Sequence, residues 1–133
     1  MREIIFRGKR TTDGEWCEGN LFVDERGDKH EILLGYTNYR IAWEVIPETV
    51  GQYTGLTDKN GKKIFEGDII CLGGKYTYTV EYSTENGAFL LMCEIDPQMP
   101  FNNTSLGEWR REAFEIVGNI HDNPELLKGG VDK

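Results

Sequence analysis

The stretch from Val50 to Cys71, VGQYTGLTDKNGKKIFEGDIIC, holds the clearest structural signal in this chain. Two apolar, β-prone runs lie on either side of Asp58-Lys59-Asn60-Gly61. An Asn-Gly pair readily adopts the positive φ angles that a tight hairpin turn requires. We therefore expect Gln52 to Leu56 and Lys63 to Ile70 to run antiparallel, with the Gly67-Asp68 step as a break in the second run.

The rest of the chain reads as short β-prone runs separated by turn residues, without an internal repeat or a linker. Before the hairpin stretch, the expected strands are Glu3 to Arg7, Glu15 to Val23, His30 to Leu34 and Tyr36 to Ile46. After the hairpin turn, the expected strands are Asp68 to Leu72, Tyr76 to Tyr82, Ala88 to Ile95 and Phe114 to Val117. The strands between Asp68 and Ile95 form a predicted three-stranded meander.

Two segments near the C-terminal end depart from the strand pattern. Pro97 to Ser105 is rich in Pro, Asn and hydroxyl side chains, and we interpret it as a loop and as a place to look for binding. Asn123 and Pro124 stand where a helix cap and the first helical residue would be, which predicts a short helix that Gly129-Gly130 ends.

Size and charge narrow the function classes. A chain of 133 residues with 38% hydrophobic side chains is long enough to bury a core, and we expect one domain over residues 1–133. The net charge of -8 disfavours nucleic acid as a partner. The short basic stretches, which we interpret as solvated turns, are Arg7-Gly8-Lys9-Arg10 and Lys59 with Lys62 and Lys63.

The three cysteines are widely spaced and form no CxxC pair, so the sequence signals neither a disulfide framework nor a zinc site. Cys71 and Cys93 lie in apolar runs, which predicts core positions, whereas Cys17 stands beside Glu18, which disfavours a thiolate. No apolar run approaches the ~20 residues that cross a bilayer. We expect a soluble cytoplasmic protein with reduced thiols and no membrane contact.

The sequence ETVGQYTGLTDKNGKKIFEGDII at Glu48 to Ile70, followed by IVGNIHDNPELL at Ile116 to Leu127, resembles the YopX family of small phage and prophage proteins. The opening Phe6 to Arg10, followed by Gly14-Glu15-Trp16, is similar to one branch of that family. The resemblance implies a mostly β fold with an SH3-like barrel as its core. It also implies a gene carried by mobile elements, hence a bacterial host cell, and no assigned enzymatic reaction.

We therefore expect a mostly β protein with a small SH3-like barrel, a β-hairpin-rich N-terminal extension and a short C-terminal helix. The common catalytic signatures GxSxG, HExxH and GxxxxGK[ST] are absent from the sequence. We predict no cofactor. Asp58, Asn60 and Gly61 match only the start of a calcium loop, and we interpret them as the hairpin turn.

Glu66 and Asp68 are the best candidates for metal ligands. Residues two apart on a strand point to the same face, and a pair of carboxylates there can hold a divalent cation. The alternative is structural, because Glu66-Gly67-Asp68 also fits a turn whose Asp accepts backbone N–H groups.

The candidate binding residues are aromatic: Trp16, Tyr53, Tyr76 and Tyr78. Tyr76, Tyr78 and Val80 alternate along a predicted strand and should share one face. Some of these rings could line a groove for an extended peptide or single-stranded nucleic acid, and the negative net charge favours a protein. The alternative is that they are core residues and cross-strand pairs.

Two hypotheses from different classes follow. The first is a noncatalytic interaction module that binds a protein partner or forms a homo-oligomer. The second is a metal-dependent hydrolase acting on nucleic acid or nucleotide, built on Glu66 and Asp68 with Glu81 as a further candidate.

Overall fold

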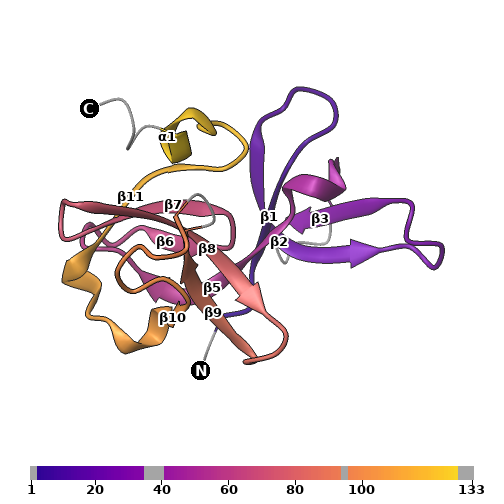
Figure 1. The fold of residues 1–133 in the computed structure, drawn as a ribbon. Helices are drawn as coiled ribbons and strands as arrows, with labels where there is room; N and C mark the ends of the chain where they lie inside the picture. Colours follow the sequence, from indigo (N-terminus) through magenta and orange to yellow (C-terminus); the bar gives the residue numbers. More distant parts are fainter. Residues whose placement is uncertain (1–2, 35–40, 94–95, 129–133) are drawn as a thin grey trace. The chain divides into compact units, whose positions relative to one another are not determined.

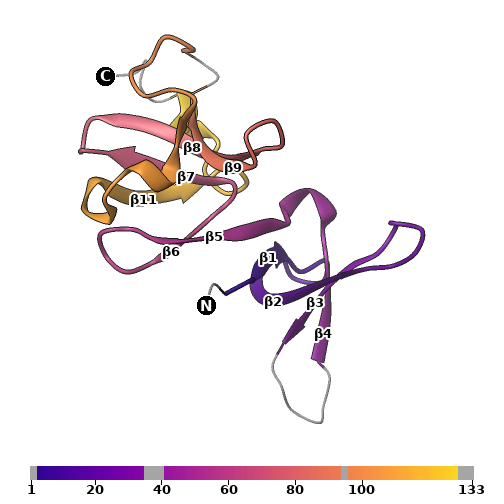
Figure 2. The same cartoon turned by 90° about the horizontal axis from the view of Figure 1, so that it is seen from below.

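Figures 1 and 2 show a computed structural model that describes residues 3–34, 41–93 and 96–128. The chain divides into two compact units, residues 1–53 and 54–133, which we call the N-terminal unit and the C-terminal unit. Each unit has its own hydrophobic core. The expectation of one domain over residues 1–133 stays a prediction.

The N-terminal unit is an antiparallel sheet in the order β4-β3-β2-β1, continued by the first residues of β5. Its described elements are β1 (Phe6–Lys9), β2 (Trp16–Val23), β3 (His30–Leu34), β4 (Ile41–Val45), the 3-10 helix η1 (Pro47–Thr49) and the start of β5 (Gly51–Thr57). Arg10 forms a further bridge with Val45, so the chain after β1 also meets the end of β4.

The core of the N-terminal unit lies on one face of this sheet. Its fully packed members are Cys17, Ile32 and Val45. A glycine in β2 lets two strands approach, since a Cβ atom on Gly19 would lie 2.1 Å from the carbonyl oxygen of Leu33. The close pairing of β2 with β3 therefore depends on the missing side chain at this position.

The C-terminal unit holds a second antiparallel sheet in the order β10-β9-β8-β7-β11, and the rest of β5 pairs with β6. Its described elements are β6 (Lys63–Phe65), β7 (Asp68–Leu72), β8 (Tyr76–Ser83), β9 (Ala88–Met92), β10 (Thr104–Ser105), the 3-10 helices η2 (Leu106–Glu108) and η3 (Arg111–Ala113), β11 (Phe114–Asn119) and α1 (Glu125–Lys128). The predicted meander is confirmed as β7, β8 and β9.

The core of the C-terminal unit follows the alternation that the sequence predicts. Tyr78 and Val80 of β8 are buried, and they pack with the following side chains: Ile64, Ile70, Leu72, Leu91, Leu106 and Phe114. Adjacent residues Leu90 and Leu91 of β9 are both buried, so this strand is covered on both faces. An apolar run is the pattern expected of such a strand.

The hairpin prediction is right for its first half and wrong for its second. Lys63–Phe65 forms β6 beside β5, but Gly67 turns the chain with a φ of 93°, and Asp68 starts a strand of the other sheet. The turn also differs from the expected type, because Gly61 has a positive φ and Asn60 does not. The Asp58 N–H bonds to the Lys62 carbonyl at 2.8 Å, which gives a three-residue connection.

Near the C-terminal end, two further details differ from the prediction. Thr104–Ser105 forms β10 instead of continuing the loop. The Asn123 Oδ1 atom accepts the N–H of Asn119 at 3.2 Å, so the expected cap residue supports the preceding turn. The parts of the predictions at residues 36–40, 94–95 and 129–130 lie outside the described residues.

The mostly β fold and the short C-terminal helix are confirmed. The predicted β-hairpin-rich N-terminal extension is a compact unit with its own sheet and core. The described strands form two antiparallel sheets and no closed barrel. The SH3-like barrel stays a prediction.

Candidate functional site

The carboxylate of Asp58 accepts hydrogen bonds from three backbone N–H groups of the C-terminal unit. Asp58 is fully buried in the β5–β6 turn. Its Oδ1 atom accepts the N–H groups of Asn60 at 2.9 Å and Lys62 at 3.0 Å. Its Oδ2 atom accepts the N–H of Ile116 in β11 at 3.1 Å. The predicted turn is therefore also hydrogen-bonded to β11, a strand that is distant in the sequence.

The ionised form of Asp58 is favoured despite its burial. Desolvation opposes the charge, but the backbone N–H groups of Ile116, Lys62 and Asn60 outweigh it, and the pKa of Asp58 is lowered from the ordinary 3.8. A carboxylate that accepts several backbone N–H groups is stabilised in its charged form. Asp58 therefore acts as a fixed acceptor for the backbone.

The candidate metal ligands Glu66 and Asp68 occupy different structural settings. Glu66 lies in the turn after β6, whereas Asp68 is buried as the first residue of β7. The Oδ2 atom of Asp68 accepts the N–H of Phe65 at 2.7 Å. This bond is the one that the structural interpretation of Glu66-Gly67-Asp68 expects.

The third candidate of the hydrolase hypothesis, Glu81, accepts the hydroxyl of Thr79 at 2.9 Å. Among residues 3–34, 41–93 and 96–128, no group of three or more His, Cys, Asp or Glu side chains has the arrangement of a metal site. The metal site at Glu66 and Asp68 stays a prediction, and no contact described above favours it.

The candidate binding residues of the N-terminal unit are Trp16 and Tyr53. Trp16 is half-buried at the start of β2, and two cations of β1 lie over its ring, with Arg7 Cζ 4.7 Å and Lys9 Nζ 5.5 Å from the ring centroid. Tyr53 is buried in β5. Part of the Trp16 ring is therefore exposed to solvent, and two basic side chains lie over the ring.

The basic stretch Arg7-Gly8-Lys9-Arg10 is packed rather than simply solvated. Arg10 pairs with Asp13, to which its Nε donates at 2.9 Å, and its Cζ lies 4.1 Å from the ring centroid of Trp43. Cation–aromatic stacking of this kind stabilises an exposed sheet surface modestly.

The candidate binding residues of the C-terminal unit are Tyr76 and Tyr78. Tyr78 is fully buried, its hydroxyl donates to the carbonyl of Pro100, and its desolvation raises its pKa. Tyr76 is half-buried and makes an edge-to-face contact with Phe101 at 6.4 Å. Phe101 contacts Trp109 at 4.8 Å in the same way. Tyr78 serves the core, and Tyr76 belongs to an aromatic cluster at the surface.

The loop singled out for binding is held onto the sheet. Besides the Tyr78 hydroxyl at Pro100, the Oδ1 atom of Asn102 accepts the N–H of Cys93 at 2.7 Å, and the N–H of Asn103 bonds to Leu91 at 2.8 Å. One of these bonds joins the loop to β8, and the other two join it to β9 and to the residue after β9.

Among the cysteines, Cys17 is the buried one, whereas Cys71 and Cys93 are half-buried. The expectation that both apolar-run cysteines are core residues is thus only partly right. Burial, followed by smaller electrostatic effects that include Asp13 and Glu18, raises the pKa of the Cys17 thiol. A protonated, buried thiol is chemically inert.

Large apolar side chains are exposed at the end of the β2–β3 hairpin. Phe22 is 53% exposed and Val23 is 40% exposed. They stand opposite Glu31 and His30 in the register of the two strands. The sequence predicts a strand at Phe22 and Val23. It does not predict that their side chains are exposed, because apolar residues of a strand normally pack on a second layer.

The fold and these contacts define a class: a small, mostly β protein of two units with antiparallel sheets, in which buried carboxylates accept hydrogen bonds from backbone N–H groups. The family model described as "YopX protein" matches residues 5–128, and the chain belongs to the YopX family. The chain is also similar to the crystal structure of protein EF1440 from Enterococcus faecalis. The TM-score is 0.59 at 23% identity, over 96% of this chain and 99% of that one.

No curated protein matches the sequence. The likeness to protein EF1440 concerns the fold alone. Within the described residues, none of the helices has the length and apolar character needed to span a membrane.

Proposed function

We propose that this protein is a noncatalytic interaction module that binds a protein partner or assembles with itself. The observation that carries the proposal is the uncovered end of the β2–β3 hairpin, where Phe22 and Val23 are both exposed. We call this end the apolar ribbon. The phage or prophage origin and the cytoplasmic location implied by the family resemblance belong to the same proposal.

Successive strand residues point to opposite faces of a sheet. The exposure of Phe22 and Val23 therefore means that neither face of the apolar ribbon is well covered. β4 continues the sheet beside β3 here, with Val45 opposite His30 and Glu44 opposite Glu31, but the side chains of Phe22 and Val23 stay exposed at the apolar ribbon. Burial of these side chains against another surface would stabilise it, by about 1 to 3 kcal/mol for a side chain of the size of Phe.

The edge strand of the same sheet supports the proposal. β4 stands at the end of the strand order, and Ile41 at its start is 51% exposed. Edge strands present backbone groups that can pair with another chain. Arg10 bridges to Val45 at the other end of β4, which leaves the Ile41 end as the accessible part of the edge among the described residues.

The buried carboxylates support a noncatalytic role. Asp58 and Asp68 are bonded to backbone N–H groups that hold turns and strands in place. A group with these structural duties cannot change its bonding during a reaction without disturbing the fold.

The test compares Phe22→Ser with Val117→Ser, a control that changes an exposed apolar side chain of β11. Each protein is expressed in bacteria, purified by affinity and measured by light scattering after size exclusion. The proposal expects Phe22→Ser to lose the oligomer or the stoichiometric partner that the wild type and Val117→Ser keep. A wild-type protein that is monomeric and free of partners would contradict it.

A further inference from the structure

The charges of the C-terminal unit are unevenly distributed. Residues 54–127 contain six basic side chains, all of them exposed: Lys59, Lys62, Lys63, Lys75, Arg110 and Arg111. They come from three segments that are far apart in the sequence, namely the β5–β6 hairpin, the β7–β8 turn and the chain around η3. Contacts between these segments place them at one end of the unit.

The hairpin meets the start of β11. The N–H of Lys59 bonds to the carbonyl of Phe114 at 3.0 Å. The Nη2 atom of Arg111 lies 3.8 Å from the position that a Cβ atom would occupy on Gly61. The guanidinium group of Arg111 is therefore beside the tip of the hairpin that carries the three lysines.

The β7–β8 turn reaches the same place from the other side of β11. The N–H of Gly73 bonds to the carbonyl of Ala113 at 3.0 Å, and Leu72 stands opposite Phe114 in the strand register. Lys75 follows in this turn, with its Nζ 5.3 Å from the ring centroid of Tyr76. We call the surface formed by the six basic residues the basic end.

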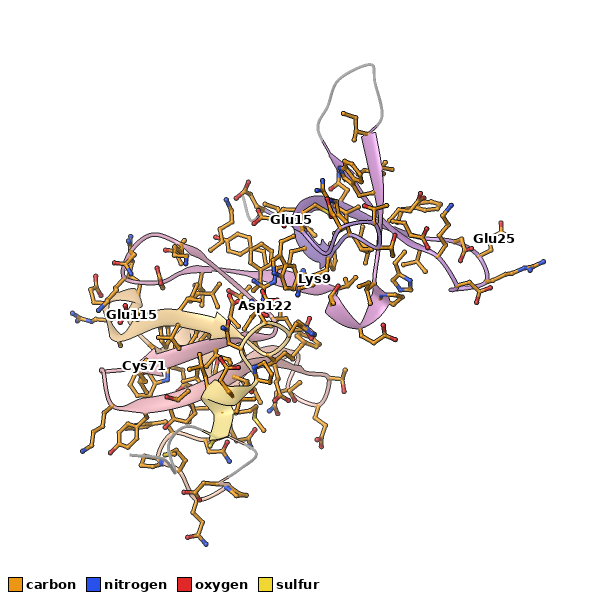
Figure 3. The ribbon with its side chains drawn as sticks, turned by 90° about the horizontal axis from the view of Figure 1, so that it is seen from above. Lys9, Glu15, Glu25, Cys71, Glu115 and Asp122 are labelled. Atoms are coloured by element: carbon orange, nitrogen blue, oxygen red, sulfur yellow. The ribbon has the colours of Figure 1, made fainter. Side chains whose placement is uncertain are left out.

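The acidic groups nearby neutralise the basic end only in part. Asp58 is buried and bonded to backbone N–H groups, and Glu115 pairs with Lys59 at 3.3 Å. Figure 3 labels Glu115 on β11, beside Cys71 of β7, with which it pairs in register. Glu108 and Glu112 are the exposed acids of the adjoining segment. The six basic side chains of the basic end thus outnumber the three acids of the adjoining residues 108–115, in a chain whose net charge is -8.

An aromatic cluster with one exposed ring adjoins the basic end. Phe101 is 44% exposed, and it contacts both Tyr76 and Trp109 edge to face. Lys75 and Arg110 are the sequence neighbours of Tyr76 and Trp109. Lys75 lies over the ring of Tyr76, which contacts Phe101, so the basic end adjoins an accessible apolar ring.

From this arrangement we infer that the basic end binds an acidic peptide segment of a partner protein, with an apolar side chain of that segment resting against Phe101. Several cations that act together attract and orient an acidic partner. The inference goes beyond the proposed function, because it concerns a surface of the C-terminal unit and does not depend on the apolar ribbon.

A short acidic peptide fits this surface better than nucleic acid does. A nucleic acid strand carries one charge per ~3.4 Å along its length and would extend past six cations. The acidic side chains elsewhere in the unit, which would repel it, include Glu66, Glu81, Glu85, Asp96, Asp122 and Glu125. A segment confined to the basic end avoids them.

The experiment measures fluorescence anisotropy of a labelled synthetic peptide rich in Asp and Glu, with one central Phe. The comparison probes are the same peptide with Asn and Gln in place of the acids, and single-stranded oligothymidine of equal charge. The triple variant Lys62→Ala/Lys75→Ala/Arg111→Ala is compared with Arg26→Ala, which removes an exposed cation from a turn of the N-terminal unit.

The acidic peptide should bind the wild type and Arg26→Ala equally, and the triple variant about tenfold more weakly, the loss expected when a few exposed ion pairs are removed together. Binding should weaken as NaCl rises from about 0.05 M to about 0.5 M. Amide shifts of Gly61, Gly73 and Gly74 in an NMR titration should locate the peptide. The inference would be overturned if oligothymidine bound more tightly than the acidic peptide, or if the uncharged peptide bound as tightly as the acidic one. Failure of the acidic peptide to bind the wild type would also overturn it.

Discussion

The carboxylate of Asp58, in the turn between β5 and β6, accepts the backbone N–H of Ile116 in β11 at 3.1 Å, across 58 positions of sequence. Together with the bond from the Lys59 N–H to Phe114, it covers the outer edge of β11. A strand at the edge of a sheet would otherwise expose these groups. One turn residue thus shapes the hairpin and protects an edge.

Removing this carboxylate should destabilise the C-terminal unit. We expect Asp58→Ala to lower the free energy of unfolding by about 3 kcal/mol, because three backbone N–H groups lose a charged acceptor. Urea unfolding followed by circular dichroism measures the change.

The matched control is Asp24→Ala, whose carboxylate accepts the N–H groups of Asp28 and Lys29, both within five residues. It should cost about 1 kcal/mol or less. Equal losses for the two variants would show that the long-range bond to Ile116 contributes nothing.

Asp58 also makes the stability of the protein depend on pH. Its folded-state pKa lies below the ordinary 3.8, so the unfolded chain binds more protons as the pH approaches that value. The stabilisation is present above the ordinary pKa and is lost as the pH falls through the folded-state pKa. Urea midpoints measured from pH 6 downward should fall less steeply with acid in Asp58→Asn than in the wild type. Identical slopes would exclude Asp58 as a source of the acid dependence.

The backbone of β3 occupies the space that a side chain on Gly19 would need. In Gly19→Ala, the new Cβ would lie 2.1 Å from the carbonyl oxygen of Leu33, so β2 and β3 must separate. The expected loss of stability is about 3 kcal/mol or more. Gly107→Ala is the control, because the nearest atom to its Cβ would be 3.8 Å away. Thermal unfolding of both variants decides the point, and a Gly19→Ala protein as stable as its control would refute the close approach of the strands.

Cys17 should be the least reactive of the three thiols. It is buried, its Sγ contacts the carbonyl of Gly8 at 3.6 Å, and burial raises its pKa. Less thiolate and less access both slow alkylation. At a pH of about 8, iodoacetamide labelling followed by mass spectrometry should modify Cys71 and Cys93 about tenfold faster or more, and Cys17 only on unfolding. Rapid labelling of Cys17 in the folded protein would contradict its burial.

Local signals in the sequence predicted most of the strands. The meander of β7, β8 and β9 follows from alternating apolar residues and from the Gly73-Gly74 and Asn86-Gly87 turns, all of which act over a few residues. The sequence also predicts a break at Gly67. The sheet that the chain joins after Gly67 is decided by pairing with β8 and β11, not by the turn itself.

The site was less accessible to sequence reasoning because its contacts are long-range. The sequence around Asp58 predicts an ordinary hairpin residue, and no neighbouring residue indicates that Ile116 is its hydrogen-bond partner. Arg111 joins the hairpin lysines only once the chain beside β11 has folded against the turn. The exposure of Phe22 likewise depends on the absence of a covering layer among the described residues, which a strand pattern does not reveal.

The central claim, that the protein acts by binding another chain, is tested most directly by the mass of the native particle. Light scattering after size exclusion, with native mass spectrometry of the same fractions, gives that mass and its composition. The account predicts a defined oligomer of the 15.2 kDa chain or a stoichiometric complex with a second protein. A lone monomer that carries one bound metal ion per chain would contradict it and would direct attention to Glu66 and Asp68.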